Sequence, residues 1–289
     1  MKALVITADD FGLHEAVNEA VERAHRDGVL TCTSLMVGAE AVDDAVRRAR
    51  AAPQLAVGLH VVLADGRAVL PPRRIPALVD DSGRFADRMA RDGVRFFTLP
   101  RVRRQLEAEI RAQFAAFAAT GVPLDHVNAH KHFHLHPTVL SMLLAIGAEH
   151  GSPPVRWPRE PRWAAGRDGG ALGSALLAPW LALMRRRLRA AGVACNDQLF
   201  GLAGTGAMDE ARLLGILAAL PEGLTEIYLH PATRNGLTST MGAYRHRDEL
   251  DALLSARVRA AVRASGAATG GWRTLTAALA ARSQPSRAA

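Results

Sequence analysis

The sequence predicts an α/β fold in which parallel strands form a closed or nearly closed (β/α) barrel covered by helices. Short apolar runs alternate with longer segments whose apolar residues recur at helical spacing, a pattern typical of a parallel sheet with covering helices. About seven such units in 289 residues match a barrel, which takes about 250 residues. A doubly wound open sheet is the alternative, but no glycine-rich phosphate-binding motif follows the first strand. We therefore expect one barrel domain over residues 1–289, with a frayed tail over 283–289.

Each predicted strand is a short apolar run that ends at a polar residue or a turn. The first run, Lys2 to Ala8, stops at Asp9. The predicted strands are 2–8, 32–37, 55–60, 126–130, 155–157, a short strand at 194, and 225–230.

Each predicted helix carries apolar residues three or four positions apart. Gly28 ends the first helix and Gly121 the third, and Pro137 stands early in the first turn of the fourth. The predicted helices are 15–26, 41–51, 99–120, 137–150, 171–191, 207–220, 248–264 and a last helix from Trp272.

The composition excludes several classes of protein. Apolar residues make up 49% and charged residues 22%, which excludes a disordered chain, a collagen and a disulfide scaffold. No stretch reaches the roughly 20 apolar residues of a membrane-spanning helix, and the apolar run at the N-terminus is too short for a signal peptide. Two cysteines, Cys32 and Cys195, suit a reducing compartment, so we expect a cytoplasmic protein.

The net charge of +8 is carried almost entirely by arginine, because Lys2 and Lys131 are the only lysines among the 36 basic residues. A GC-rich genome would produce this composition. Attraction to an anionic surface, either nucleic acid or lipid headgroups, is the alternative interpretation. Bulk charge does not separate these possibilities, so the positions of the arginines must decide between them.

Polar residues that could carry chemistry stand where the predicted strands end. Asp9 and Asp10 close the first strand, His60 the third, His130 the fourth and His230 a late strand. In a parallel barrel these ends lie on one face, which is the face that carries the active site.

The segment 125–137 is dense in histidine. Its five histidines are His126, His130, His132, His134 and His136. A catalytic Zn²⁺ takes three protein ligands and keeps one position open, so not all five can be ligands. We expect His130 to be a ligand and His126 to be a hydrogen-bonded strand histidine. His132 is a weaker ligand candidate, and His134 and His136 suit helix capping or contacts with a substrate.

The adjacent carboxylates Asp9 and Asp10 repel each other unless a cation lies beside them. A metal could take one carboxylate as a ligand and leave the other as base for the attacking water. The alternative is a surface turn that leads into Phe11 and Gly12.

These motifs together resemble the YdjC/ChbG family of carbohydrate deacetylases, and most closely its hopanoid-biosynthesis-associated HpnK branch. The residues that carry the resemblance are Thr7 to Leu13, Asn18, Gly58 to His60, the histidine-rich segment, and His230-Pro231. The resemblance implies a deformed barrel of the NodB-like, TIM-like kind and one divalent metal ion, with Zn expected and Mg, Mn, Co or Ni as alternatives. One departure is Asn128-Ala129-His130, where members acting on sugar oligomers often have Asp-Ser-His.

The resemblance also implies roles for individual residues. Asp10, His60 and His130 would be the metal ligands, Asp9 the general base, and His230 the acid that protonates the leaving amine.

Four residues near the strand ends are candidates for substrate binding. A backbone N–H near Phe11 could hold the oxyanion, and Trp157 could stack on a sugar ring. Arg156 could bond to the acetyl group or to Asp9, and His132 could also contact the substrate. The alternative for Arg156 and Trp157 is ordinary packing at the rim of the barrel.

The predicted function is a metal-dependent N-deacetylase acting on an N-acetylated amino sugar, and the resemblance to the HpnK branch implies an N-acetylglucosaminyl hopanoid lipid as that substrate. Soluble N-acetylglucosamine oligosaccharides are the alternative substrates. A metal-dependent phosphoesterase or nuclease would want two metals about 4 Å apart and more carboxylates. A non-enzymatic protein that binds lipid or nucleic acid is a further alternative, although we expect no nucleic-acid partner.

The segment 171–184 is apolar on nearly every side, and Arg185, Arg186, Arg187 and Arg189 follow it. It is too short, and too interrupted by Pro179, to span a bilayer. The pattern fits a helix that lies in the membrane interface, which predicts peripheral membrane contact through 171–189 at the inner membrane face. A buried barrel helix with a polar end is the alternative.

Overall fold

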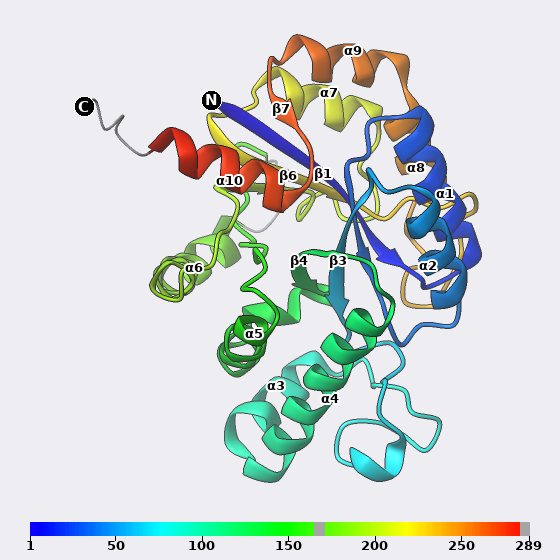
Figure 1. Ribbon diagram of the computed structural model, residues 1–289, viewed down its shortest axis with the longest axis vertical. Helices are drawn as coiled ribbons and strands as arrows, with labels where there is room; N and C mark the ends of the chain where they lie inside the picture. The colour runs from blue at the N-terminus through cyan, green and yellow to red at the C-terminus, as the bar shows by residue number, and fades with distance from the viewer. Residues whose placement is uncertain (165–170, 284–289) are drawn as a thin grey trace.

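The computed structural model describes residues 1–164 and 171–283. Its centre is a curved parallel sheet with strand order β4-β3-β2-β1-β6-β5 (Figure 1). The strands are β1 (Lys2–Phe11), β2 (Cys32–Leu35), β3 (Ala56–Val61), β4 (Leu124–Ala129), β5 (Gln198–Phe200) and β6 (Gly223–Leu229). A two-residue strand, β7 (Ala268–Thr269), pairs with the first half of β1.

Helices surround this sheet, and the last of them packs against β1, β4 and β6 (Figure 1). They are α1 (Glu15–Asp27), α2 (Val42–Ala51), α3 (Met89–Thr98), α4 (Pro100–Ala119), α5 (Pro137–Glu149), α6 (Ala171–Ala190), α7 (Glu210–Ala218), α8 (His246–Leu254), α9 (Ala256–Ala264) and α10 (Trp272–Ser283). Two short 3₁₀ helices, η1 (Pro72–Arg74) and η2 (His130–Leu135), interrupt the connections. Strands and helices alternate as the sequence predicted.

An irregular segment, residues 154–159, fills the gap between the edge strands β4 and β5. On one side the Val127 N–H donates to the carbonyl of Pro154. On the other side the Val155 N–H donates to Ala194, and the Leu199 N–H donates to Arg159. The sheet therefore closes through one isolated bridge, between Val127 and Val155, and scattered hydrogen bonds in place of a full ladder. The prediction of a deformed (β/α) barrel is confirmed.

Several details differ from the sequence-based expectation. The predicted strand 155–157 forms only an isolated bridge, and β5 was not expected. The predicted helix 248–264 is two helices, because Ser255 has extended backbone (φ −60°, ψ 131°) and its hydroxyl caps the first N–H groups of α9. Helix α3 precedes Leu99, where no helix was expected. Ala194 contributes one hydrogen bond without forming a strand. Of the tail expected to fray, Ser283 ends α10, and residues 284–289 lie outside the described residues.

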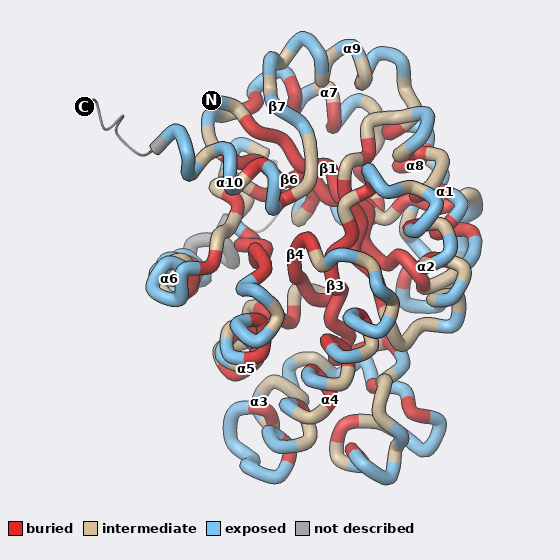
Figure 2. Tube along the Cα trace, in the orientation of Figure 1, coloured by how far each residue is buried: buried red, intermediate tan, exposed pale blue. Residues whose placement is uncertain are grey.

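The strands are buried on both faces, as Figure 2 shows by the concentration of buried residues along them. Apolar side chains of the strands pack under the helices. Many buried polar side chains gather within the barrel, including Asp9, Asp10, His60, Asn128, Arg156 and Glu226. Burying charged groups is costly unless they are paired or bind a metal, so the interior of the barrel is built for polar contacts. Within the described residues, no helix is both long enough and apolar enough to cross a membrane.

Candidate metal centre

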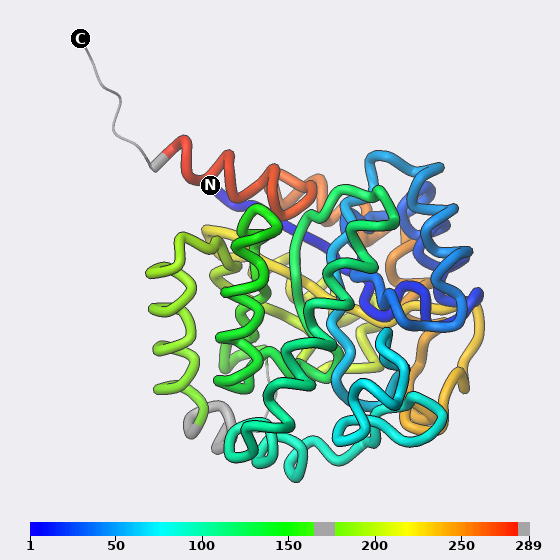
Figure 3. Tube along the Cα trace, turned by 60° about the horizontal axis from the view of Figure 1, so that its bottom comes forward, coloured from blue at the N-terminus to red at the C-terminus, as the bar shows by residue number. Residues whose placement is uncertain are grey.

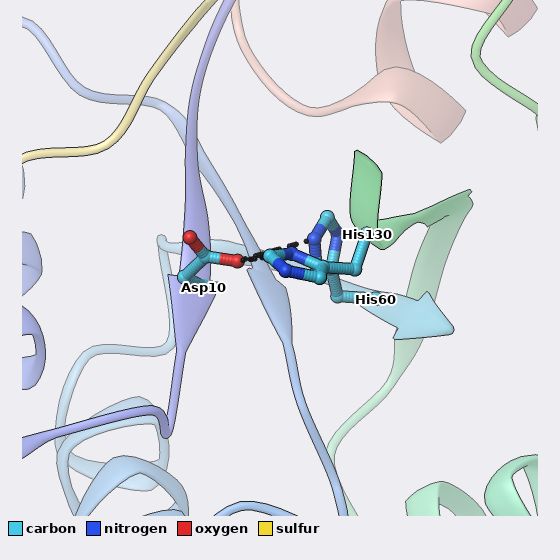
Figure 4. A group of neighbouring side chains, drawn as sticks. All are labelled: Asp10, His60 and His130. Carbon is cyan, nitrogen blue, oxygen red and sulfur yellow. Dashed lines mark hydrogen bonds and ion pairs between the residues drawn. The ribbon is translucent and has the colours of Figure 1, made fainter. Parts of the chain in front are cut away.

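Asp10, His60 and His130 meet at the carboxyl ends of their strands (Figure 4). Asp10 Oδ1 lies 3.0 Å from His130 Nδ1 and 3.3 Å from His60 Nε2. The two imidazole rings stand edge to face with centroids 5.5 Å apart. All three side chains are buried.

A bulge in β1 lets two consecutive carboxylates enter the same site. Neighbouring residues of a regular strand point to opposite faces. Between Ala8 and Phe11 the pairing of β1 with β2 shifts register, and Asp10 has a φ of +65°. A β-bulge of this kind re-aims a side chain, and a non-glycine residue at such a φ costs about 1–2 kcal/mol. Asp9 and Asp10 therefore both contact His60 within the barrel.

The donor set fits a divalent metal ion. Among the described residues, Asp10 Oδ2 and His130 Nε2 are buried and lack a hydrogen-bond partner. One ligand atom from each of the three side chains lies within 4.8 Å of the other two. Two imidazoles and one carboxylate are ligands that Zn²⁺ and related ions take in catalytic sites. Burial would raise the pKa of Asp10, but His130 and His60 outweigh it and hold this pKa well below its usual value, so the carboxylate is ionised.

Asp9 is held in one orientation by Arg156. The Arg156 guanidinium donates to Asp9 Oδ2 at 2.6 Å and to Oδ1 at 3.0 Å, and it also donates twice to Glu226. Burial would raise the pKa of Asp9, but the charge of Arg156, followed by that of His60, holds it far below its usual value. Asp9 is therefore a fixed carboxylate beside the metal ligands rather than one of a repelling pair.

A buried polar chain formed by Asp125, His126, Ser34 and Asn128 runs along the barrel to this centre. His126 Nδ1 lies 3.1 Å from Asp125 Oδ2, and His126 Nε2 lies 3.0 Å from the Ser34 hydroxyl. The Asn128 amide donates to that hydroxyl at 2.9 Å. The His126 ring lies against Gly58, where any side chain would meet the ring at 2.5 Å.

The polar chain fixes the tautomer of His60, one of the candidate metal ligands. The Asn128 amide nitrogen donates to Ser34 and, at 3.1 Å, to Asp9, so the amide oxygen faces His60. That oxygen accepts from His60 Nδ1 at 2.6 Å. The proton of neutral His60 therefore sits on Nδ1, and the lone pair on Nε2 points toward Asp10, as metal binding requires.

At its far end the polar chain meets the start of α10. Asp125 accepts the backbone N–H groups of Trp272 and Arg273, and Trp272 stacks on the His126 ring. Cys32 is also close to Asp125, at 4.0 Å. Cys32, Asp125 and His126 thus form a second group of possible metal ligands. The Asp125 carboxylate already accepts hydrogen bonds, and burial raises the pKa of the Cys32 thiol, so this group suits hydrogen bonding better than metal binding.

His230 follows β6 and lies among aromatic rings. Its ring is 5.5 Å from that of Tyr228 and 5.2 Å from that of Tyr244. Its Nδ1 is buried without a partner among the described residues. Burial lowers the pKa of His230, although Asp10 and Asp9 act in the opposite direction. The side chain therefore offers a free nitrogen beside the centre.

The residues predicted to bind substrate have different surroundings. Phe11 is fully buried in the apolar core, and the neighbouring Gly12 N–H already donates to Asn18. Trp157 is only 4% exposed, its N–H donates to the carbonyl of Leu181, and the Arg185 guanidinium lies 4.7 Å from its ring centre. Packing covers the Trp157 ring, and the Gly12 N–H is already used by Asn18, so neither is free for the role that was predicted.

Arg156 and His132 do lie beside the centre. Arg156 contacts Asp9, which is one of the two roles that the sequence suggested, and its charge lies over the Tyr228 ring at 4.7 Å. His132 Nε2 lies 3.0 Å from the Tyr228 hydroxyl, and its Nδ1 is unpartnered among the described residues. Burial, together with Arg156, holds the pKa of His132 well below its usual value, so its ring is neutral.

Sequence reasoning missed the β6 residues that complete the site. Glu226 accepts from Arg156 and from the Thr7 hydroxyl, and Tyr228 contacts His132 and Thr205. A charged residue in the middle of the buried apolar run 224–229 was the signal that could have found them.

The curved parallel sheet, with a carboxylate and two imidazoles at the carboxyl ends of its strands, defines the chain as an α/β-barrel protein with a candidate mononuclear metal centre. The family model described as YdjC-like protein matches residues 3–264. The chain belongs to this family.

Relatives and solved structures agree with this membership. A carbohydrate deacetylase from Thermoanaerobacter pseudethanolicus is 25% identical over 87% of this chain and 89% of its own length. One from Brevibacillus brevis is 39% identical over 54% of this chain, and the match spans 59% of that protein. A chitooligosaccharide deacetylase from Escherichia fergusonii is 33% identical over 52% of this chain and 57% of its own.

A crystal structure from Enterococcus faecalis V583, described as a cellobiose-phosphate cleavage protein, has a TM-score of 0.74 with this chain. The two are 25% identical, and the match covers 95% of this chain and 98% of the other. The barrel is thus shared over nearly the full length of both.

Proposed function

We propose that the protein is a metal-dependent carbohydrate N-deacetylase that removes acetate from an N-acetylated amino sugar. The observation that carries the proposal is the pairing of an Asp10–His60–His130 ligand set with a separate carboxylate, Asp9, that Arg156 holds in place. The carbohydrate deacetylases among the relatives support the substrate class.

In this proposal Asp10, His60 and His130 hold one divalent ion. Zn²⁺ is the ion that we expect from two imidazoles and one carboxylate, and Mg, Mn, Co and Ni are the alternatives. The metal would polarise the acetyl carbonyl and lower the pKa of a bound water.

Side chains of the protein accept and donate the protons of the reaction. Water adds its oxygen to the acetyl carbon while Asp9 accepts its proton, since Asp9 is ionised and fixed toward the ligands. As the bond from carbon to nitrogen breaks, the amine takes a proton from His230, and acetate leaves. His230 is placed for this role because its Nδ1 is free. Burial lowers the pKa of His230, and the carboxylates of Asp9 and Asp10 oppose that lowering.

A phosphoesterase built on two metals fits this centre less well. Such a site needs a second set of carboxylate ligands about 4 Å from the first ion. The nearby carboxylates Asp9 and Glu226 are both committed to Arg156. A site with one set of ligands therefore favours amide hydrolysis at a single metal ion over phosphoester hydrolysis at two.

For the particular substrate, we propose an N-acetylglucosaminyl hopanoid lipid, with soluble N-acetylglucosamine oligosaccharides as the alternative. The sequence resemblance to the hopanoid branch supports the lipid, and the chitooligosaccharide deacetylase among the relatives supports the alternative. Asn128 bears on this choice, because an aspartate there would face Asp9 with a second carboxylate.

Peripheral membrane contact through 171–189 remains part of the proposal, but only some side chains of this segment are available for it. Leu181, Met184 and Leu188 of this segment are buried, and Arg185 pairs with Asp197. The exposed side chains are fewer than the sequence indicates. Among the described residues of this segment, the large apolar and charged side chains that are exposed are Leu177, Leu183, Arg186 and Arg189.

The test is acetate release from the lipid-linked sugar and from a chitooligosaccharide, each measured with and without a chelator. We expect release that the chelator abolishes and that added Zn²⁺ restores. Release that persists unchanged in the chelator would refute the metal dependence, and release from neither substrate would refute the deacetylase.

A further inference from the structure

Helix α3 lies at the end of the barrel that carries the candidate metal centre. Its Phe96 packs edge to face on Phe133 of η2, with ring centroids 5.4 Å apart. Just before α3, Asp87 pairs with Lys131, the residue after His130. Figure 3 shows residues 89–98 at the lower end of the molecule, where the amino-terminal end of α6 also lies. A surface on α3 therefore adjoins the segment that supplies a ligand.

This helix presents large apolar side chains to solvent. Val94 and Phe97 are each 64% exposed and Leu99 is 45% exposed, whereas Phe96 beside them is 1% exposed. Removing phenylalanine and leucine side chains from water is favourable, so an exposed group of them marks a binding surface.

Unpaired arginines flank these apolar side chains. Arg88, Arg91, Arg101, Arg103 and Arg104 are all exposed, and none forms an ion pair within the described part of the chain. The two neighbouring acids are already neutralised, Asp92 by Arg95 and Asp87 by Lys131. The α3 surface, which comprises these five arginines with Val94, Phe97 and Leu99, is therefore strongly positive.

Another large apolar side chain is exposed just after the 154–159 segment. Trp163 is 55% exposed, and its ring lies 5.3 Å from that of Phe200, the last residue of β5. It thus stands at the carboxyl end of a strand, as the metal ligands do. Tryptophan is enriched where protein meets the headgroup region of a membrane.

We propose that the α3 surface binds the anionic headgroups of a phospholipid bilayer and turns the metal-centre end of the barrel toward the membrane. Arginines are attracted to an anionic leaflet, and the apolar side chains enter the boundary of the acyl chains. The exposed apolar groups favour a bilayer over nucleic acid, whose interfaces are polar and wet. This binding does not depend on the proposed deacetylation, but it would bring a lipid-linked sugar to the site.

Helix α6 is a poorer membrane surface for this orientation. In Figure 3 it stands upright beside the barrel, so only its first residues reach the lower end. A helix in that position cannot lie flat on a membrane that the lower end touches. The exposed side of α6 therefore provides a matched control.

The experiment is co-sedimentation of the full chain with vesicles of phosphatidylcholine alone and with phosphatidylserine added. The apolar variant is Phe97→Ser with Leu99→Ser, and the charge variant is Arg91→Glu with Arg101→Glu. The control on α6 is Leu183→Ser with Arg186→Glu. Circular dichroism checks folding, and metal content checks the centre.

We expect the wild type and the α6 control to pellet with anionic vesicles, and each α3 variant to bind at least about tenfold more weakly. The charge variant should lose the salt dependence of binding as well. The proposal fails if the wild type does not pellet, if both α3 variants pellet like the wild type, or if the α6 control alone is lost. Binding to duplex DNA without binding to vesicles, or dimerisation through the α3 surface, would also overturn it. Activity on a soluble sugar is measured separately, so failure here leaves the proposed reaction standing.

Discussion

Asp9 and Asp10 are chain neighbours with different surroundings. Arg156 holds Asp9, whereas Asp10 contacts the two imidazoles of the candidate ligand set. The bulge in β1 makes this possible, because it turns both side chains into the barrel. The different partners predict that substitutions of the two residues have different effects.

Asp9→Asn should retain the metal and lose turnover. Asparagine keeps the shape of the side chain but cannot accept the proton, so we expect kcat to fall by at least about a hundredfold. Metal content measured by elemental analysis should equal that of the wild type. A kcat within a few-fold of the wild type would remove Asp9 from the mechanism.

His130→Ala should lose both metal and activity with little loss of fold. The substitution removes one of the three proposed ligands. It breaks no hydrogen bond of Nε2, because His130 Nε2 has no partner among the described residues. The matched control is His150→Ala, at the end of α5 and beside Phe114. Equal metal content in His130→Ala and the control would show that the ligand assignment is wrong.

At the scale of elements, α10 is attached to the barrel through Asp125. This carboxylate accepts the first two N–H groups of the helix and contacts His126. Asp125→Asn places an N–H₂ group against these donors, so we expect the free energy of unfolding to fall by about 1–3 kcal/mol. Urea unfolding measures this, with the exposed Asp251→Asn as control. Equal stability of the two variants would exclude the attachment.

The grouping of the candidate ligands could be predicted because each stands where an apolar strand ends. Asp10, His60 and His130 follow runs whose burial the sequence makes plain, and parallel strands bring their ends together. The spacing of apolar residues likewise predicted most helices.

The contact of Arg156 with Asp9 was one of two suggested roles, but the carboxylate that holds Arg156 from its other side could not be predicted in the same way. Arg156 and Glu226 lie 70 residues apart, and only the closed barrel brings them together. The bulge at Asp10 leaves no mark on the apolar pattern. The break at Ser255 was missed because apolar spacing continues through it, while the serine cap acts locally.

At the scale of the whole molecule, buried histidines should make stability depend on pH. Burial lowers the pKa of His132, His136 and His230, and it lowers that of His134 to about 3. Because the unfolded chain binds protons more readily there, the free energy of unfolding should rise with pH between about 3 and 6.5. Glu249, whose pKa burial raises to about 7, acts in the opposite direction between about 4.5 and 7.

His134→Gln tests this dependence, since glutamine carries no charge at any pH. In a chelator, the wild type should gain up to about 2 kcal/mol more than the variant between pH 5.0 and 6.5. Urea unfolding at the two pH values gives both numbers. The same gain in both proteins would mean that His134 is protonated equally in the folded and unfolded states.

The order of the strands also predicts which part of the site forms first during folding. β1 to β4 pair with their chain neighbours, so Asp10, His60 and His130 can meet while only the first half of the chain is folded. Glu226 reaches Thr7 of β1 across 219 residues, and it is the second anchor of the arginine that orients Asp9. Because contacts between distant residues form slowly, a refolding chain should recover metal affinity earlier than turnover. Stopped-flow refolding with a metal indicator and a parallel activity assay would resolve the two recoveries, and their coincidence would mean that both halves of the barrel form together.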